Sequence, residues 1–278
     1  MTTAAPVAML MAVHAGADVA HFDEALASLR AQTHGDVRIL LYVDGPLTAA
    51  HEAVIAGRLR LGAGTDRVVR GATPAGLPIG LNRLIDTALD DPAIRFLARM
   101  DADDICLPTR IERQVAFLDA HPQVSVAGTW CIEFDRPGVP TFYKQLPTDT
   151  AAVREVMLFR SPRAHPTVMF RRAVLEAGFR YDPALKIMQD YEFWSRLLAS
   201  GHVISNVPEY LLWYRMADGF YGRRTGFERA WGEVKLRWRY ARQLRLLRPK
   251  LLLGLLALFL LRLSPQAVKR LAYARLRS

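Results

Sequence analysis

Short runs of continuous apolar residues, each long enough for one strand, recur between segments of helical periodicity in the first part of the chain. They occupy residues 7–13, 37–43, 67–69, 94–100 and 124–130. Because these runs do not alternate with polar residues, their strands are predicted to be covered on both faces, as in a mostly parallel sheet. Asp18 and Pro108 stand where helices between the runs would begin. Residues 1–130 are therefore expected to form a doubly wound α/β unit.

The pattern becomes mixed after a Pro-rich passage near residues 137–147. Helices are expected at 153–159 and from about 190 to 199, and strands at 166–172 and 209–215. The sequence thus predicts one domain over residues 1–220, with parts 1–130 and 131–220, followed by a helical tail over 221–278.

Three aspartates, Asp101, Asp103 and Asp104, directly follow the apolar run that ends at Met100. Ligands of doubly wound sheets bind beyond the carboxyl ends of the strands, so these side chains are expected at that edge. Carboxylates close together repel unless a cation or a ligand hydroxyl lies between them. Hard oxygen ligands favour Mg or Mn, commonly shared with substrate phosphates. An ordinary turn whose aspartates cap the next helix is the alternative.

Two further carboxylates stand at the ends of predicted elements. Asp44 follows the second run, where it could accept hydrogen bonds from a base or a ribose, although Asp-Gly-Pro is also an ordinary turn. Asp190, between Gln189 and Glu192, begins an amphipathic helix. It is either the N-cap of that helix or a general base that takes the proton of an attacking hydroxyl. The sequence alone leaves both alternatives open.

The ordered segments "YVDG", "GLPIGLNRLID", "RMDADDICLPTRIERQVAFL", "HPTVMFRR", "QDYEFWSRLLASG" and "YLLWYRM" resemble family 2 glycosyltransferases. The resemblance spans most of residues 7–216. It implies a GT-A fold, a Rossmann-like doubly wound mixed sheet, and transfer of a sugar with inversion from a nucleotide-diphosphate donor. It also implies that residues 1–130 bind the nucleotide sugar and residues 131–220 the acceptor.

The resemblance assigns roles to individual residues. Donor contacts are expected from Asp44, Asn82, Asp101, Asp103 and His165. Asp103 and Asp101 would hold Mg or Mn, and Asp190 would be the catalytic base. Supporting positions are Asp104, Gln189 and Glu192. For His165 the alternative is a pre-proline residue in extended conformation.

The chain departs from the family pattern in three places. They are Ala12 and Ala15 after the first strand, Gly45 and Pro46 after the second, and Ala217 where a histidine is common. Asp218 is the candidate to replace that histidine near the metal. UDP-sugar or dTDP-sugar is the expected donor, and a saccharide or lipid-linked saccharide of the cell envelope is the expected acceptor. The alternatives are a degenerate, non-catalytic sugar-binding or scaffold protein and a sugar-nucleotide pyrophosphorylase, although no Gly-rich loop follows the first strand.

The net charge of +10 belongs to the tail: residues 223–278 carry 15 Lys/Arg and two acids, which leaves 22 basic and 25 acidic residues elsewhere. Phe227, Trp231, Val234, Trp238 and Ala241 form an apolar stripe at helical spacing. The apolar run 251–261 is shorter than the roughly 20 residues that cross a bilayer.

These features predict that residues 221–278 lie on an anionic membrane surface. A helical hairpin packed on the enzyme or between subunits is the alternative. The acidic body and the long leucine run argue against nucleic acid. With only Cys106 and Cys131, no disulfide framework is indicated. We expect a cytoplasmic enzyme, peripheral on the inner face of the cell membrane.

Overall fold

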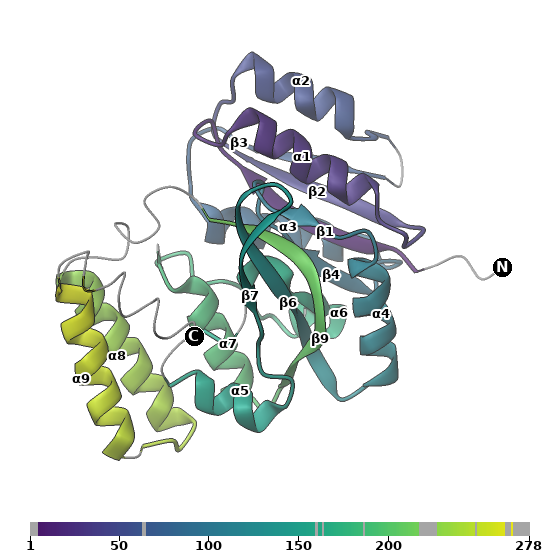
Figure 1. Cartoon of the computed structure of the whole chain (residues 1–278). Helices are drawn as coiled ribbons and strands as arrows, with labels where there is room; N and C mark the ends of the chain where they lie inside the picture. Colours follow the sequence, from purple (N-terminus) through teal and green to yellow (C-terminus); the bar gives the residue numbers. More distant parts are fainter. Residues whose placement is uncertain are drawn as a thin grey trace.

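In the computed structural model, which describes residues 5–62, 65–158, 161–162, 164–185, 187–216, 227–247, 249–264 and 268, one mixed sheet forms the centre of the molecule (Figure 1). The described strands follow the order β3-β2-β1-β4-β8-β6-β9-β5, and β7 pairs with β6. Their bounds are β1 Val7–Val13, β2 Val37–Asp44, β3 Arg67–Gly71, β4 Phe96–Arg99, β5 Ile105–Cys106, β6 Val124–Arg136, β7 Val139–Lys144, β8 Met169–Arg171 and β9 Val203–Arg215.

The first four strands are parallel, and β1 lies between β2 and β4. Val7 pairs with Val37 on one side and with Phe96 on the other. Strands β8 and β6 then continue the sheet, with β8 antiparallel to both β4 and β6. The predicted parallel unit is thus present, and β8 makes the whole sheet mixed. The carboxyl ends of β2 and β4 consequently lie at the same edge.

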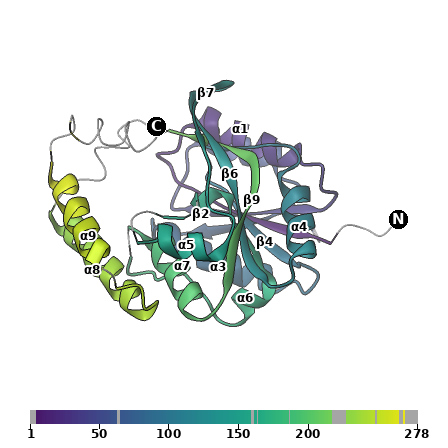
Figure 2. The same cartoon turned by 60° about the horizontal axis from the view of Figure 1, so that its bottom comes forward.

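Helices cover both faces of the sheet (Figures 1 and 2). Their bounds are α1 Val19–Arg30, α2 Ala49–Arg58, α3 Leu77–Leu89, α4 Arg110–Ala120, α5 Thr150–Val156, α6 Arg172–Glu176, α7 Gln189–Ala199, α8 Phe227–Gln243 and α9 Pro249–Leu263. Met9 of β1 belongs to the core shared with Phe22 of α1, whereas Leu10 belongs to the core shared with Leu81 of α3. Successive side chains of β1 therefore enter opposite cores, which explains its continuous apolar sequence.

The sequence predicted the start of helix α1 correctly, but the bounds of strands β8 and β9 only in part. Asp18 is the N-cap of α1, as predicted, and its Oδ1 accepts a hydrogen bond of 2.9 Å from the His21 amide. The strand predicted at 166–172 is shorter, because residues 165–167 form a 3₁₀ turn. In this turn the amide and the hydroxyl of Thr167 both donate to the Ala164 carbonyl, at 3.0 and 2.8 Å. The strand predicted at 209–215 begins earlier, at Val203, because it pairs with β6 from there.

The tail helices α8 and α9 pack side by side, and α8 lies between α9 and α7 (Figures 1 and 2). The buried face of α8 differs from the predicted stripe: Trp231 and Trp238 are exposed, while Glu233, Arg237 and Tyr240 are buried. The two described helices of the tail thus pack on the rest of the chain, as in the predicted alternative of a helical hairpin packed on the enzyme. Among the described residues, every helix is too short or too polar to pass through a lipid bilayer.

The close packing of α3 on β2 gives a stability prediction. A Cβ added at Gly80 would lie 2.3 Å from Cδ1 of Tyr42. Gly80→Ala should therefore lower the free energy of unfolding by about 1–3 kcal/mol through overpacking, despite the better helix propensity of alanine. At Gly57 in α2 an added Cβ meets none of the described residues within 4 Å, so Gly57→Ala should raise it by up to about 1 kcal/mol. Urea denaturation of both variants measures the difference, and a stabilised Gly80→Ala protein would contradict the packing.

Candidate active site at the carboxyl end of strand β4

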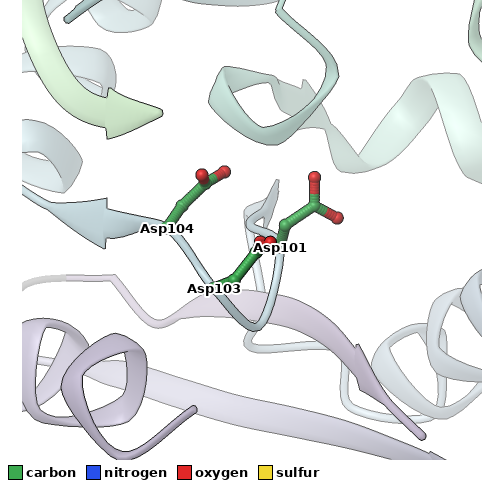
Figure 3. Close-up of side chains that lie close together, drawn as sticks. All are labelled: Asp101, Asp103 and Asp104. Carbon is green, nitrogen blue, oxygen red and sulfur yellow. The ribbon is translucent and has the colours of Figure 1, made fainter. Parts of the chain in front are cut away.

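A tight turn between β4 and β5 brings three aspartates together. One carboxylate oxygen from each of Asp101, Asp103 and Asp104 lies within 4.8 Å of the others. Figure 3 shows the three side chains on this single turn, with the Asp101 and Asp104 carboxylates projecting to the same side. They stand where the parallel strands end, which is the edge predicted from the apolar runs.

Strand β9 holds the aspartate turn through strand pairing and hydrogen bonds. Strand β5 pairs with β9 at Cys106 and Leu212. At the end of β9, the Arg215 amide donates to Oδ1 of Asp104 at 2.9 Å, and Nε of Arg215 donates to the Asp103 carbonyl at 2.8 Å. Nη2 of Arg215 also donates to Glu24 of α1 at 2.6 Å. The positions of these aspartates are thus fixed by contacts across the sheet.

The turn does not cap the next helix. Thr109 is the N-cap of α4, and its side chain makes no capping hydrogen bond. The first-turn amide of Ile111 donates instead to Oε1 of Gln32 at 3.2 Å. The structure therefore gives no support to the alternative in which these aspartates serve α4.

The three carboxylates carry more negative charge than the described residues around them compensate. Burial raises the pKa of Asp104 well above its usual value, and the charges of Asp101 and Asp103 add to the increase. Burial and the charge of Asp101 also raise the pKa of Asp103. Within the described structure, Oδ2 of Asp104 is buried without a hydrogen-bond partner. Nη2 of the buried Arg99 donates to Asp101 and provides part of the balancing charge.

This donor set fits a hard divalent cation. Mg²⁺ and Mn²⁺ prefer oxygen ligands, and the cluster offers three carboxylates, one of them with an oxygen that no described group satisfies. A cation there would favour the ionised forms that burial disfavours. Asp101, Asp103 and Asp104 are thus suitable ligands for such an ion.

Asp44 and Asn82 both organise backbone segments near this edge. The Asp44 carboxylate accepts hydrogen bonds from the amides of Ala75 at 2.6 Å and Gly76 at 3.0 Å, just before α3. Asn82 exchanges two hydrogen bonds of 2.8 Å with the backbone of Tyr181. Since β1 separates β2 from β4, Asp44 ends the second strand along the sheet from β4, whose end carries the aspartate turn.

His165 lies beside the end of β4 because β8 runs antiparallel to that strand. The Arg99 amide donates to the Val168 carbonyl at 2.9 Å, which holds the 165–167 turn against β4. Nε2 of His165 is 2.9 Å from the hydroxyl oxygen of Tyr181. Burial and the charge of Arg99 lower the pKa of His165 well below its usual value, so its imidazole is neutral near pH 7. In the structure His165 is part of a 3₁₀ turn and not of an extended strand.

Asp190 lies in the first turn of α7 and not at its N-cap. The N-cap is Met188, which has a left-handed backbone with φ 58°. The Ser161 hydroxyl is 3.5 Å from Oδ2 of Asp190. Gln189 is half-buried, whereas the carboxylate of Glu192 accepts hydrogen bonds from Arg196 and Tyr240. Glu192 therefore has a structural role within the helix layer.

Tyr181 lies within electrostatic reach of two carboxylates that the sequence placed on separate elements. Burial raises the pKa of Tyr181, the charge of Arg99 opposes the increase, and the charges of Asp190 and Asp101 add to it. The start of α7 and the aspartate turn thus both lie near this tyrosine.

The sequence reasoning missed Arg99, Arg215 and Tyr181. Arg99 had a signal, because a lone charge inside an apolar strand next to acidic residues indicates a buried partner. Arg215 had a weaker signal at the end of "YLLWYR". Tyr181 had none, since its link to Asn82 joins residues 99 positions apart. Ala217 and Asp218 fall outside the described residues.

The sequence profile of glycosyl transferase family 2 matches residues 20–179. The chain belongs to this family. The amylovoran biosynthesis glycosyltransferase AmsE of Erwinia amylovora is 30% identical over 216 residues, 78% of each chain. The UDP-Gal:alpha-D-GlcNAc-diphosphoundecaprenol beta-1,3-galactosyltransferase of Escherichia coli is 24% identical over 268 residues, 96% of this chain and 94% of that one. This family 2 glycosyltransferase thus has relatives in bacterial polysaccharide synthesis.

Solved structures confirm the predicted GT-A fold. S. aureus TarS 1-349 in complex with UDP-GlcNAc aligns with a TM-score of 0.62 and 18% identity, over 86% of this chain and 70% of TarS. The mannosyltransferase PcManGT from Pyrobaculum calidifontis, in complex with GDP-Man and Mn²⁺, aligns with a TM-score of 0.60 and 15% identity, over 97% of this chain and 79% of that one. At these identities the similarity establishes the fold of the family 2 chain.

The charge excess gives opposite stability predictions for two aspartates of the turn. Because the folded state raises the pKa of Asp103, its ionised form opposes folding at pH 7. Without divalent cations, Asp103→Asn should therefore melt above wild type at pH 7. The difference in melting temperature should become smaller as the pH falls through the raised pKa of Asp103, because the wild-type carboxyl then takes up a proton.

Asp101→Asn is the matched comparison, because it leaves the buried Arg99 without its anionic partner. Its free energy of unfolding should fall by about 1–3 kcal/mol, because the buried Arg99 guanidinium loses the anionic acceptor of its hydrogen bond, which is itself partly exposed. Calorimetry in EDTA measures both variants. If Asp103→Asn melts below wild type, the inference that Asp101, Asp103 and Asp104 carry excess negative charge is wrong.

Proposed function

We propose that the chain is a metal-dependent, inverting transferase that moves a sugar from a nucleotide-diphosphate donor to a hydroxyl of a saccharide or lipid-linked saccharide. The observation that carries this proposal is the cluster of three carboxylates within 4.8 Å at the end of β4 in a family 2 glycosyltransferase. Structural neighbours bound to UDP-GlcNAc and to GDP-Man with Mn²⁺ support a nucleotide-sugar donor. UDP-sugar or dTDP-sugar is the proposed donor, and envelope polysaccharide synthesis is the proposed setting.

In this proposal residues 1–130 bind the donor and residues 131–220 bind the acceptor. Asp101 and Asp103 hold the Mg or Mn ion, and Asp104 supports them through its hydrogen bond from Arg215. When bound, the ion supplies Lewis-acid stabilisation of the nucleotide-diphosphate leaving group. Asp44 shapes the nucleoside side of the site through the loop before α3.

Asn82 and His165 are proposed donor contacts, and both are hydrogen-bonded to Tyr181. Asn82 fixes the backbone of Tyr181, and the neutral His165 contacts its hydroxyl. Donor contacts from these two residues thus depend on the position of a shared neighbour.

Asp190 is the proposed general base. Its place in the first turn of α7 suits a carboxylate, because the amino end of a helix favours negative charge. There it would take the proton of the acceptor hydroxyl, which attacks the anomeric carbon from the face opposite the diphosphate. A single displacement of this kind inverts that carbon.

Two substitutions separate base catalysis from donor binding. Asp190→Asn should retain donor affinity but lower transfer by at least about 10²-fold, since it cannot accept the proton. Asp103→Ala should lose Mn-dependent donor binding. Calorimetric titration of nucleotide sugars and measurement of released nucleotide diphosphate provide the two readouts.

Asp86→Asn is the control, because Asp86 is exposed and paired only with Arg180 among the described residues. Undiminished transfer by Asp190→Asn would refute its role as base. A wild-type chain that binds the donor without turnover would instead support the degenerate sugar-binding alternative, and pyrophosphate-dependent release of a nucleoside triphosphate would support a pyrophosphorylase.

We also propose that the tail docks on the anionic inner face of the cell membrane. The outer face of α9 exposes Leu252, Leu253, Leu256, Leu260 and Leu263, at spacings that place them along one side of the helix. The exposed residues of α8 include Trp231 and Trp238 together with Lys235, Arg239 and Arg242. Exposed leucine, tryptophan and basic side chains are typical of helices that lie in the interface of an anionic membrane.

Vesicle sedimentation tests the docking surface. The double variant Leu253→Glu, Leu256→Glu should pellet with phosphatidylglycerol vesicles much less than wild type, while Leu61→Glu should pellet like wild type. Leu61 is a suitable control because it is 60% exposed but lies far along the chain from the tail. Equal pelleting of all three proteins would rule out docking through α9.

A further inference from the structure

We propose that helix α8 of the tail positions the predicted base Asp190 through two of its side chains, Tyr240 and Arg237. The inference rests on the proposed function, because it concerns the geometry of the proposed base. Helix α8 would then affect catalysis although it lies beyond residues 20–179, which the family profile matches.

The first contact joins Tyr240 to the residue two positions after Asp190. The Tyr240 hydroxyl donates a hydrogen bond of 2.7 Å to Oε1 of Glu192. Both residues are buried, at 2% and 6% exposure, so water does not replace this bond readily. Oε1 of Glu192 also accepts from Nε of Arg196 at 2.7 Å, and Oε2 accepts from Nη2 at 2.9 Å. Tyr240 therefore fixes the first turn of α7 from outside that helix.

The second contact joins Arg237 to both segments that meet at Asp190. Its guanidinium carbon lies 4.7 Å from the ring centroid of Tyr191, the residue directly after Asp190. Nη1 of Arg237 and the hydroxyl of Tyr191 both donate to the Met157 carbonyl, at 3.0 and 2.9 Å. Met157 is the C-cap of α5 and stands four residues before Ser161 in the sequence, whose hydroxyl is 3.5 Å from Oδ2 of Asp190. Arg237 thus links Tyr191, at the start of α7, to the residue that caps α5.

Helix α8 is itself held in place by a buried ion cluster. Glu233 accepts from Arg237 at 2.9 Å and from Arg262 of α9 at 2.8 Å. Burial raises the pKa of the Glu233 carboxyl, but the hydrogen bond from Arg262 and the charge of Arg237 outweigh burial and lower it to about 2. The cluster is therefore charged at neutral pH, and removing one partner would strand a buried charge. Helices α8 and α9 consequently act on α7 as one unit.

The start of α7 depends on these contacts because its own cap is weak. Met188, the N-cap residue, adopts a left-handed backbone, and its own side chain makes no capping hydrogen bond. A left-handed conformation costs a non-glycine residue roughly 1–2 kcal/mol. A general base must stay within hydrogen-bond reach of its proton, and a misplacement of about 1 Å can lower the rate about 10²-fold. The tail thus supplies orientation that the helix terminus lacks.

Tyr240→Phe in the full chain tests the proposal, since it removes the hydroxyl and keeps the ring. We expect kcat to fall about tenfold while the donor KM stays within about twofold, because only the base is misplaced. Hydrogen exchange at residues 190–194 should become faster. Arg237→Lys keeps a cation beside Glu233 with a single nitrogen, and should show the same selective loss of kcat. Ser264→Ala, which removes a tail hydroxyl that bonds the Leu261 carbonyl, is the control and should match wild type.

The outcomes separate positioning from packing and from failure of the proposed function. A lower melting temperature with unchanged kcat would overturn the proposal, as would a parallel change in kcat and donor KM. Unchanged exchange at 190–194 in Tyr240→Phe would also overturn it. A wild-type chain without transfer would refute the proposed function alone, because hydrogen exchange still decides whether Tyr240 orders the start of α7.

Discussion

The repulsion among three carboxylates on one turn is the constraint on which the rest of the site depends. Asp101, Asp103 and Asp104 lie within 4.8 Å of one another, and burial raises the pKa of two of them. Such an arrangement persists only if surrounding structure enforces it. Arg99 from β4 and Arg215 from β9 do so, one by charge and the other by fixing the backbone. The sheet thus keeps together groups that would separate in water.

The sequence predicted the parts of this fold that depend on neighbouring residues. Continuous apolar runs identified the parallel strands, and Asp18 identified the start of α1, because both signals are local. The rule for strand ends placed Asp44 and the aspartate turn at one edge. The contacts of Asn82 with Tyr181 and of Arg215 with Asp104 span 99 and 111 residues. Such contacts depend on the antiparallel position of β8 in the sheet and on the register of β9. Neither feature can be predicted from the spacing of neighbouring residues.

The buried face of α8 differs from the one that the sequence predicted. Apolar spacing predicted a single stripe that included Trp231 and Trp238, but these side chains are exposed. The buried face instead carries Glu233 and Arg237, with Arg262 from α9. Burial of charged residues is unfavourable for each one alone, so a hydrophobic pattern assigns them to solvent. Because these charged residues pair with one another, they can be buried. Part of this pairing joins α8 to α9, so the sequence pattern of one helix alone does not predict it.

The buried contacts between α7 and α8 bear on whether the tail could be replaced by that of a relative. Tyr240 and Arg237 match particular groups on the catalytic part, namely Glu192, Tyr191 and the Met157 carbonyl. A chimera joined between residues 216 and 227 would separate each side chain from its partner. A substitution on either side would then select for a compensating change on the other. The tail and the helix of the predicted base are thus expected to be inherited together, so that this enzyme evolves as one unit rather than as a catalytic module with a replaceable anchor.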